Sequence, residues 1–171
     1  VDIPTNLIQS LVIPKDIDLT VTRDGLIKLN DNSLRIEGPF RCGWTQAFSF
    51  KEGKNPAPLT VWKEDKFELA RQQVVFGQGS VELVVGTWFG TKANGSSPSP
   101  DDDHPAIQRA ILASREVRRL FLPAGNYRLK NTLSLAPPFV REGMNGLILE
   151  GAVERAHVEG NTEETTRLLL D

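Results

Sequence analysis

Three short apolar runs recur in the second half of the chain, and their spacing limits the choice of fold. The runs LFL, LIL and LLL begin at Leu120, Leu147 and Leu168, so they are 27 and 21 residues apart. Hairpins would place strands closer together, and alternating strands and helices would put longer helices between them. Short apolar strands at this period are typical of parallel coils that stack and bury each other's apolar faces. We therefore expect a mainly β fold built from such coils.

Residues 1–85 also have the pattern of short strands separated by turns. Asp24-Gly25 stands between two apolar stretches, and this dipeptide is a strong hairpin signal because both residues tolerate positive φ. The runs QVVFG and SVELVVG, joined by Gly77-Gln78-Gly79, indicate a further strand pair. We expect residues 1–85 to form a β-rich N-terminal segment.

The composition changes at residues 86–103, where Gly, Ser, Pro, Asn and Asp dominate, as they do in loops. The next segment predicts a short helix over residues 104–114. Pro105 fits the first turn, where its missing N–H has no partner to lose, and Asp103 is a plausible N-cap.

The expected helix has one apolar face, formed by Ile107, Ala110, Ile111 and Ser114. The side chains expected to point away from that face are Gln108, Arg109 and Arg115. A short helix of this kind covers an apolar surface.

The junction and the segments after it carry a recognisable order of motifs. Residues 89–95 read FGTKANG, aspartates occupy 101–103, and residues 106–111 read AIQRAI. Residues 120–129, LFLPAGNYRL, then supply the pattern Pro-x-Gly-x-Tyr. In this order the motifs resemble the N-terminal end of the pectate-lyase-like right-handed parallel β-helix superfamily, which reads FGAxGDGxxDD, AIQxAI and VxxPxGxYxL. GLILEGA and TRLLLD resemble the coil that follows there.

The resemblance implies that residues 86–171 form a capping loop, a helix and the first coils of a right-handed parallel β-helix. The short α-helix would cap the end of the first coil, and Gly125 would allow a sharp corner between two faces of the coil. The departures are Ala93-Asn94-Gly95 in place of Gly-Asp-Gly and an inserted SSPSP. Polysaccharide lyases, glycoside hydrolases, epimerases and phage tailspikes share this start, so it is specific for fold rather than for function.

Charge and composition exclude several classes of function. Lys and Arg number 20 against 22 Asp and Glu, which leaves a formal net charge of −2 and no electrostatic footprint for nucleic acid. No run approaches the roughly 18 apolar residues of a membrane span. Cys42 is the only cysteine, so an internal disulfide, a cysteine zinc site and a CxxC pair are excluded. We expect Cys42 to be a half-buried apolar residue.

Three adjacent aspartates are the first candidate site. Asp101, Asp102 and Asp103 offer hard oxygen ligands for Ca²⁺, but we favour an N-cap and favourable charge at the helix start. Glycoside hydrolysis needs two carboxyl groups about 5 to 10 Å apart across a sugar, whereas adjacent residues at a helix start point in different directions. We expect no cofactor, no metal and no catalytic residue in this chain.

Aromatic residues are the second candidate. Trp62, in a polar stretch, is the best candidate for an exposed platform that binds carbohydrate. Trp44 and Trp88 could also stack on sugar rings, although Trp88, beside Phe89, is expected to pack at the junction.

Histidine and basic residues complete the candidates. We expect His104 and His157 to be solvated, since nothing like a GxSxG nucleophile motif accompanies them. Lyases of the superfamily use a basic residue to abstract a proton, but on central coils. We therefore expect Arg128, Lys130 and Arg141 to be exposed structural residues.

The run TRLLLD is itself a strand, so a solenoid that stops there would have an uncapped apolar end. We therefore expect a fragment of an extracellular protein, secreted or virion-associated, that binds or degrades polysaccharide, with this portion as cap and scaffold. The alternative is a non-catalytic attachment or assembly protein, such as a tailspike base or cell-surface adhesin. Polysaccharide is the expected partner, and a homotrimer or assembly partner would cover the open end.

Overall fold

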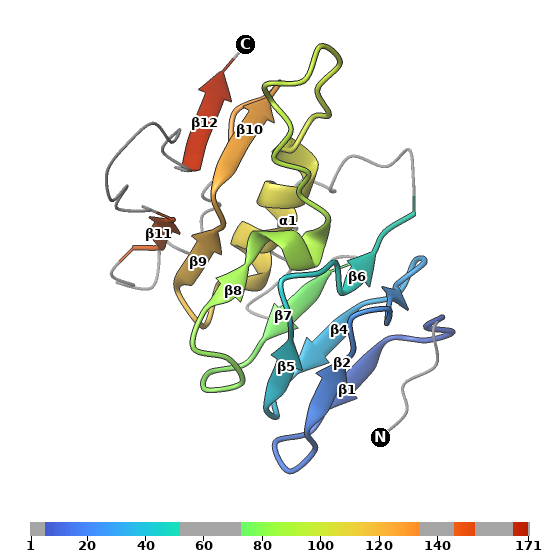
Figure 1. Ribbon diagram of the computed structural model, residues 1–171. Coiled ribbons are helices and arrows are strands. Elements are labelled where there is room, and N and C mark those ends of the chain that lie inside the picture. Colours follow the sequence, from blue (N-terminus) through green and yellow to red (C-terminus); the bar gives the residue numbers. More distant parts are fainter. Residues whose placement is uncertain (1–5, 52–72, 134–145, 153–165, 171) are drawn as a thin grey trace, which may run out of the picture.

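The computed structural model describes residues 6–51, 73–133, 146–152 and 166–170 (Figure 1). The fold is mainly β, with parallel strands and one short α-helix. In the first half the strands are β1 (Leu11–Ile13), β2 (Leu19–Val21), β3 (Ile27–Lys28), β4 (Leu34–Ile36), β5 (Phe40–Cys42), β6 (Phe48–Ser49) and β7 (Val74–Phe76). The later elements are β8 (Val84–Val85), the 3₁₀-helix η1 (Gly86–Phe89), α1 (His104–Ala113), β9 (Arg119–Leu122), β10 (Gly125–Leu129), β11 (Ile148–Gly151) and β12 (Thr166–Leu170).

Each of the first strands pairs, in parallel, with the strand three places further along the chain. Leu11 of β1 lies opposite Leu34 of β4, and Leu19 of β2 lies opposite Phe40 of β5. The pair β3–β6 follows the same rule, and β4 pairs in turn with β7. Parallel strands cannot be joined by a tight turn, so the chain must travel through two other strands before it returns beside its own previous course.

The hairpin prediction at Asp24-Gly25 is wrong. Its two flanking strands, β2 and β3, pair with β5 and β6 and not with each other. A two-residue hairpin of this type needs positive φ, but in the described chain positive φ occurs at other residues. The Gly25 N–H instead donates to the Thr22 carbonyl at 2.9 Å, in a turn that leads the chain into a different sheet. The runs around Gly77-Gln78-Gly79 likewise do not pair together, because β7 pairs with β4 and β8 with β9.

Alternation along the short strands separates the core from the surface. Leu34 and Ile36 of β4 are fully buried, while Arg35 between them faces outward. A cluster of aromatic rings lies in the interior among aliphatic side chains: the Phe40 ring lies 5.2 Å from the Phe76 ring and 5.0 Å from the Trp88 ring. Burying one such ring stabilises the fold by about 1.5–3 kcal/mol.

One apolar core runs through both halves of the chain, from Leu7 to Leu129. In Figure 1, α1 lies in the middle of the molecule, with β1, β2, β4 and β5 below it and β10 and β12 above it. The helix contacts β7, β8 and η1. It therefore packs against strands of the first half and against η1 in the junction.

The helix predicted over residues 104–114 is confirmed as His104–Ala113, with Pro105 in its first turn. Ile107, Ala110 and Ile111 are buried, as the apolar face predicted. Gln108 was expected to point away but is only 3% exposed. If only one face of the helix were covered, Gln108 would be exposed to water. Because α1 packs against β7, β8 and η1, the Gln108 side chain is buried as well.

The second half forms two further parallel groups. β9 lies between β8 and β11, and β10 pairs with β12. Gly125, at the start of β10, has φ of 151°, and a Cβ there would lie 2.5 Å from the Cβ of Ala93. The expected corner at Gly125 thus needs glycine for both its backbone and its space.

Candidate functional site

The predicted aromatic candidates separate in the structure. Trp62 lies outside the described residues, as do Arg141 and His157. Trp88 packs at the junction as predicted: it is 5% exposed, and its indole N–H donates to the Gly43 carbonyl at 2.7 Å.

Trp44 is the tryptophan that the described structure exposes. Its side chain is 67% exposed, and its ring lies 5.6 Å from the ring of Phe121, at an interplanar angle of 54°. Trp44 lies in the turn between β5 and β6, directly after Gly43. The Gly43 carbonyl accepts the hydrogen bond from the indole N–H of the buried Trp88. The hydrogen bond at Gly43 thus holds the turn that carries Trp44, and the Trp44 ring lies against the ring of Phe121.

Charged side chains lie beside this aromatic pair. Along β9, Leu120 and Leu122 are buried, while Arg119 and Phe121 lie on the opposite, outer side. The register places Glu150 of β11 opposite Phe121. The Arg119 guanidinium donates from Nε to Oε1 of Glu150 at 2.8 Å and from Nη1 to Oε1 of Glu82 at 3.0 Å.

We call this group of five residues the Trp44 surface: Trp44, Glu82, Arg119, Phe121 and Glu150. Hydrogen bonds to Glu150 and Glu82 raise the pKa of Arg119, and the hydrogen bond from Arg119 lowers the pKa of Glu150. Arg119 and Glu150 are therefore both ionised at neutral pH. The surface joins an apolar ring to groups that donate and accept charge-assisted hydrogen bonds.

The three aspartates do not converge on a common point. The Asp101 carboxylate accepts from the Asn94 side chain at 3.0 Å, and one oxygen of Asp102 accepts from the N–H groups of His104 and Lys130. In the described ranges no group of three His, Cys, Asp or Glu side chains is placed to hold a metal ion. The neighbouring carboxylates are committed to separate partners, and the structure offers no support for a shared calcium ion.

Asp103 occupies the N-cap position but does not cap the helix with its side chain. Its two carboxylate oxygens accept instead from the N–H groups of Lys92 and Ala93, at 2.6 and 3.3 Å. Burial raises the pKa of Asp103, while these backbone hydrogen bonds oppose the rise. Asp103 thus connects the junction loop to the start of α1. The predicted side-chain cap is not formed, although Asp103 does occupy the N-cap position.

The remaining candidates, His104, Cys42, Arg128 and Lys130, differ in their contacts and exposure. His104 Nε2 lies 3.1 Å from the Thr132 carbonyl oxygen. Cys42 is half-buried, as expected, and burial raises the pKa of its thiol, which disfavours the reactive thiolate. Lys130 is exposed and Arg128 is half-buried.

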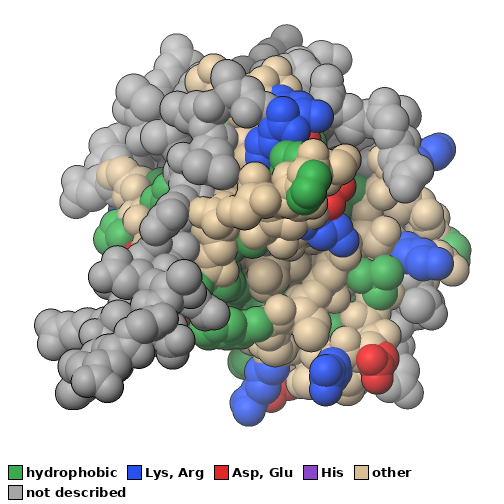
Figure 2. All heavy atoms as spheres, turned by 45° about the horizontal axis from the view of Figure 1, so that its top comes forward, with side chains coloured by type: hydrophobic (Ala, Val, Ile, Leu, Met, Phe, Trp, Pro, Cys, Tyr) green, Lys and Arg blue, Asp and Glu red, His purple; other side chains and the backbone are tan. Residues whose placement is uncertain are grey.

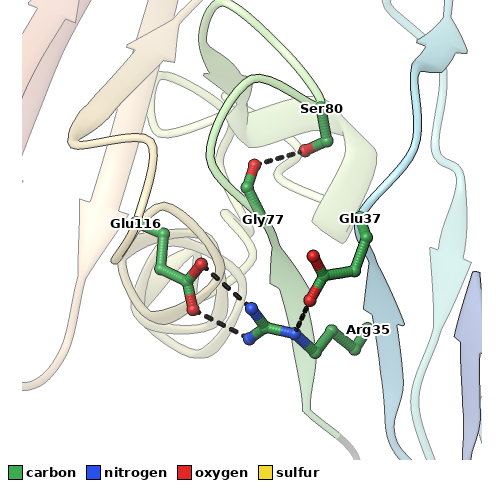
Figure 3. A network of polar contacts seen from close by, with 5 residues as sticks. All are labelled: Arg35, Glu37, Gly77, Ser80 and Glu116. Atoms are coloured by element: carbon green, nitrogen blue, oxygen red, sulfur yellow. Dashed lines mark hydrogen bonds and ion pairs between the residues drawn. The ribbon is translucent and has the colours of Figure 1, made fainter. Parts of the chain in front are cut away.

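A second charged network joins β4 to the segment after α1 (Figure 3). Arg35 donates from Nη1 and Nη2 to the two carboxylate oxygens of Glu116 and from Nε to Glu37. The Arg35 and Glu116 side chains are only 27% and 24% exposed and join two segments that are far apart in the sequence, so we assign this network to stability rather than to binding.

Figure 2 shows one face of the molecule, on which Lys and Arg side chains stand at several separate places with Asp and Glu side chains beside some of them. No helix in the described ranges has the length and hydropathy to cross a membrane. Comparison with protein-family models, with curated proteins and with solved structures finds no match.

Sequence reasoning chose Trp62 and missed the Trp44 surface. One signal was present: in RLFL, Arg119 and Phe121 alternate with Leu120 and Leu122, which predicts an outward-facing pair. The signal does not extend to Glu150, because that contact depends on which strand lies beside β9.

Proposed function

We propose that this chain contributes the first coils of a right-handed parallel β-helix to an extracellular protein, secreted or virion-associated, that binds or degrades polysaccharide. In this proposal residues 1–85 are a β-rich N-terminal segment, and residues 86–171 supply the capping loop, the helix and the following coils.

The strand pairing supports the fold in this proposal. The chain returns beside its own previous course after similar stretches in the first strand pairs, from Leu11 to Leu34 and from Leu19 to Phe40, and after longer stretches later, as from Leu34 to Val74. These stretches fall within the repeat length of stacked solenoids, which is roughly 20–45 residues. The capping role of α1 in this proposal rests on its sequence motif, because α1 contacts β7, β8 and η1 and lies between the two groups of strands in Figure 1.

The exposed ring of Trp44 is the observation that carries the function. A large aromatic ring that is two-thirds exposed, packed on a second ring and rimmed by polar groups, is typical of an interaction site. A pyranose presents an apolar face of C–H groups and a rim of hydroxyls. The Trp44 ring can stack on that face. The Glu150 carboxylate and the Arg119 guanidinium can form hydrogen bonds with the hydroxyls of the rim.

The electrostatics favour binding rather than cleavage at this surface. A glycoside hydrolase needs one carboxyl group that is protonated at working pH. Arg119 lowers the pKa of Glu150, so Glu150 is a poor proton donor. Asp103 has a raised pKa, but it is buried and held by backbone N–H groups. In the proposal, any catalytic residues of the parent protein lie outside this chain.

The alternative function, a non-catalytic attachment or assembly protein, shares the binding surface and differs in its assembly. It predicts a trimer in light scattering and no release of sugar from a bound polysaccharide. A polysaccharide-degrading parent predicts release of reducing ends or of unsaturated product.

A glycan-binding assay tests the proposal. The chain is screened against a glycan array, and the best oligosaccharide is titrated calorimetrically against the wild type and the variants Trp44→Ala and Trp62→Ala. We expect Trp44→Ala to weaken binding about 10-fold or more, as for an aromatic hot spot. Ile8→Ala, at a 90% exposed apolar residue outside the Trp44 surface, is the matched control and should bind as the wild type does. Absence of any glycan ligand, or equal affinity of Trp44→Ala and wild type, contradicts the proposal.

A further inference from the structure

We propose that the Trp44 surface selects saccharides without negative charge and disfavours uronates. This inference rests on the proposed function and concerns the substrate class of the same surface. It follows from the way in which the one cation of the surface is paired.

Arg119 is the residue that would recognise a uronate carboxylate, because a guanidinium pairs with carboxylates through parallel N–H donors. Its Nε is already bonded to Glu150 at 2.8 Å and its Nη1 to Glu82 at 3.0 Å. A sugar carboxylate would have to displace one of these partners or approach beside them. Its attraction to Arg119 is thus offset within the site.

Glu82 and Glu150 also make the net charge of the Trp44 surface negative. With one guanidinium and two carboxylates, the three charged side chains carry a formal net charge of −1. Glu82 is 83% exposed on its side chain, so an approaching anion meets its carboxylate directly. Like charges at this range repel, and salt screens the repulsion.

Uncharged sugars meet no such penalty. Carboxylate oxygens accept hydrogen bonds from hydroxyl groups, and both Glu side chains have a second oxygen beyond the one bonded to Arg119. Hydroxyls around a ring stacked on Trp44 can donate to these oxygens. The paired charges therefore suit a neutral polyol and oppose an acid.

Matched pairs of oligosaccharides separate the two classes. The first pair is a galacturonan hexasaccharide and its fully methyl-esterified form, and the second is a β-1,4-glucuronan hexasaccharide and cellohexaose. Each is titrated against the wild-type chain and against the double variant Glu82→Gln/Glu150→Gln, at low and at high salt. Circular dichroism and thermal unfolding check that the double variant is folded.

We expect the wild type to bind the neutral member of at least one pair more tightly than its acidic partner. In the double variant Arg119 is no longer compensated, so uronate affinity should rise by about 2–5-fold per carboxylate removed at low salt. That gain should shrink at high salt.

Equal or tighter binding of the acidic members by the wild type overturns this inference but leaves saccharide binding intact. An unchanged uronate affinity in a folded double variant also overturns it. If wild type and Trp44→Ala bind no saccharide in either pair or on the array, the proposed function itself fails.

Discussion

Arg35 and Glu116 stand 81 positions apart in the sequence and form a two-point ion pair, with Nη1 2.8 Å from Oε1 and Nη2 3.1 Å from Oε2. Arg35 faces outward from β4, and Glu116 lies just after α1. The pair therefore holds the helix segment against a sheet formed by the first half of the chain. Its hydrogen bond to Glu116 is the main reason that the pKa of Arg35 is raised.

The first prediction concerns this pair. Arg35→Lys keeps the charge but removes the fork that bonds both Glu116 oxygens. The side chains are only 27% and 24% exposed, so we expect a loss of about 1–2 kcal/mol in the free energy of unfolding, measured by urea denaturation. Arg41→Lys is the matched control, since Arg41 and Asp18 are exposed and 3.4 Å apart. An equal loss of unfolding free energy in the two variants would show that the two-point contact with Glu116 stabilises the fold no more than an exposed ion pair does.

The second prediction concerns the corner before β10. Gly125→Ala places a methyl group 2.5 Å from the Cβ of Ala93 on a backbone with φ of 151°. We expect it to destabilise the fold by about 2 kcal/mol or more, because both the contact and the backbone must adjust. Gly43→Ala is the control, since a Cβ at Gly43 meets no atom within 4 Å. Thermal unfolding of both variants distinguishes the site effect from a general loss of glycine flexibility.

Local patterns predicted the elements that local forces determine. The helix over His104–Ala113 followed from Pro105 and the spacing of Ile107 and Ile111, which act within one or two turns. The burial of Gln108 was not predictable in this way, because it depends on elements brought together by the fold.

Strand pairing depends on a partner that the local pattern does not specify. Asp24-Gly25 is compatible both with a hairpin and with a turn into another sheet, and the pairing of β3 with the later strand β6 decides between them. The same limit explains why the Trp44 surface was not predicted and Trp62 was preferred to Trp44: the neighbour of Trp44, Phe121, comes from a strand far along the chain. The spacing of LFL and LIL did indicate parallel pairing, since β9 pairs with β11 in parallel, whereas LLL lies in β12 and pairs with β10 instead.

The third prediction compares two adjacent aspartates. Asp103 uses both carboxylate oxygens as acceptors, for Lys92 and Ala93, whereas Asp102 uses Oδ1 alone for His104 and Lys130. An asparagine has one acceptor oxygen. We therefore expect Asp103→Asn to lower the free energy of unfolding by about 1–3 kcal/mol at neutral pH.

Asp102→Asn is the control and should stay within about 0.5 kcal/mol of the wild type, because its single oxygen can keep both bonds. The measurement is chemical denaturation of the two variants under the same conditions. A larger effect at residue 102 than at residue 103 would contradict the role assigned to Asp103.

The fourth prediction concerns stability in acid. Burial raises the pKa of Asp103 in the fold above its unfolded value, so the folded state holds this proton at a pH where the unfolded state has released it. Protonation of Asp103 therefore adds stability that is fully present below the unfolded pKa, which is about 3.9, and that is lost as pH rises through the folded pKa, whereas the two backbone hydrogen bonds of the carboxylate remain at neutral pH. In denaturation across this range, the difference in stability between wild type and Asp103→Asn should change with pH in that direction. A difference that is independent of pH would rule out the raised pKa.

The last prediction uses Tyr127, the only tyrosine of the chain. Burial, and then the charge of Asp103, raise the pKa of Tyr127 to about 12, and its hydroxyl donates to the Pro123 carbonyl at 2.7 Å. Because the unfolded phenol ionises near pH 10, this residue contributes stability that is complete below pH about 10 and lost as pH rises toward 12. Phenolate absorbance at alkaline pH reports this one group, and its midpoint should lie well above 10 in the folded chain and near 10 in urea. Tyr127→Phe should remove the absorbance change and flatten the alkaline loss of stability, whereas a folded-state midpoint near 10 would contradict the buried environment of this hydroxyl.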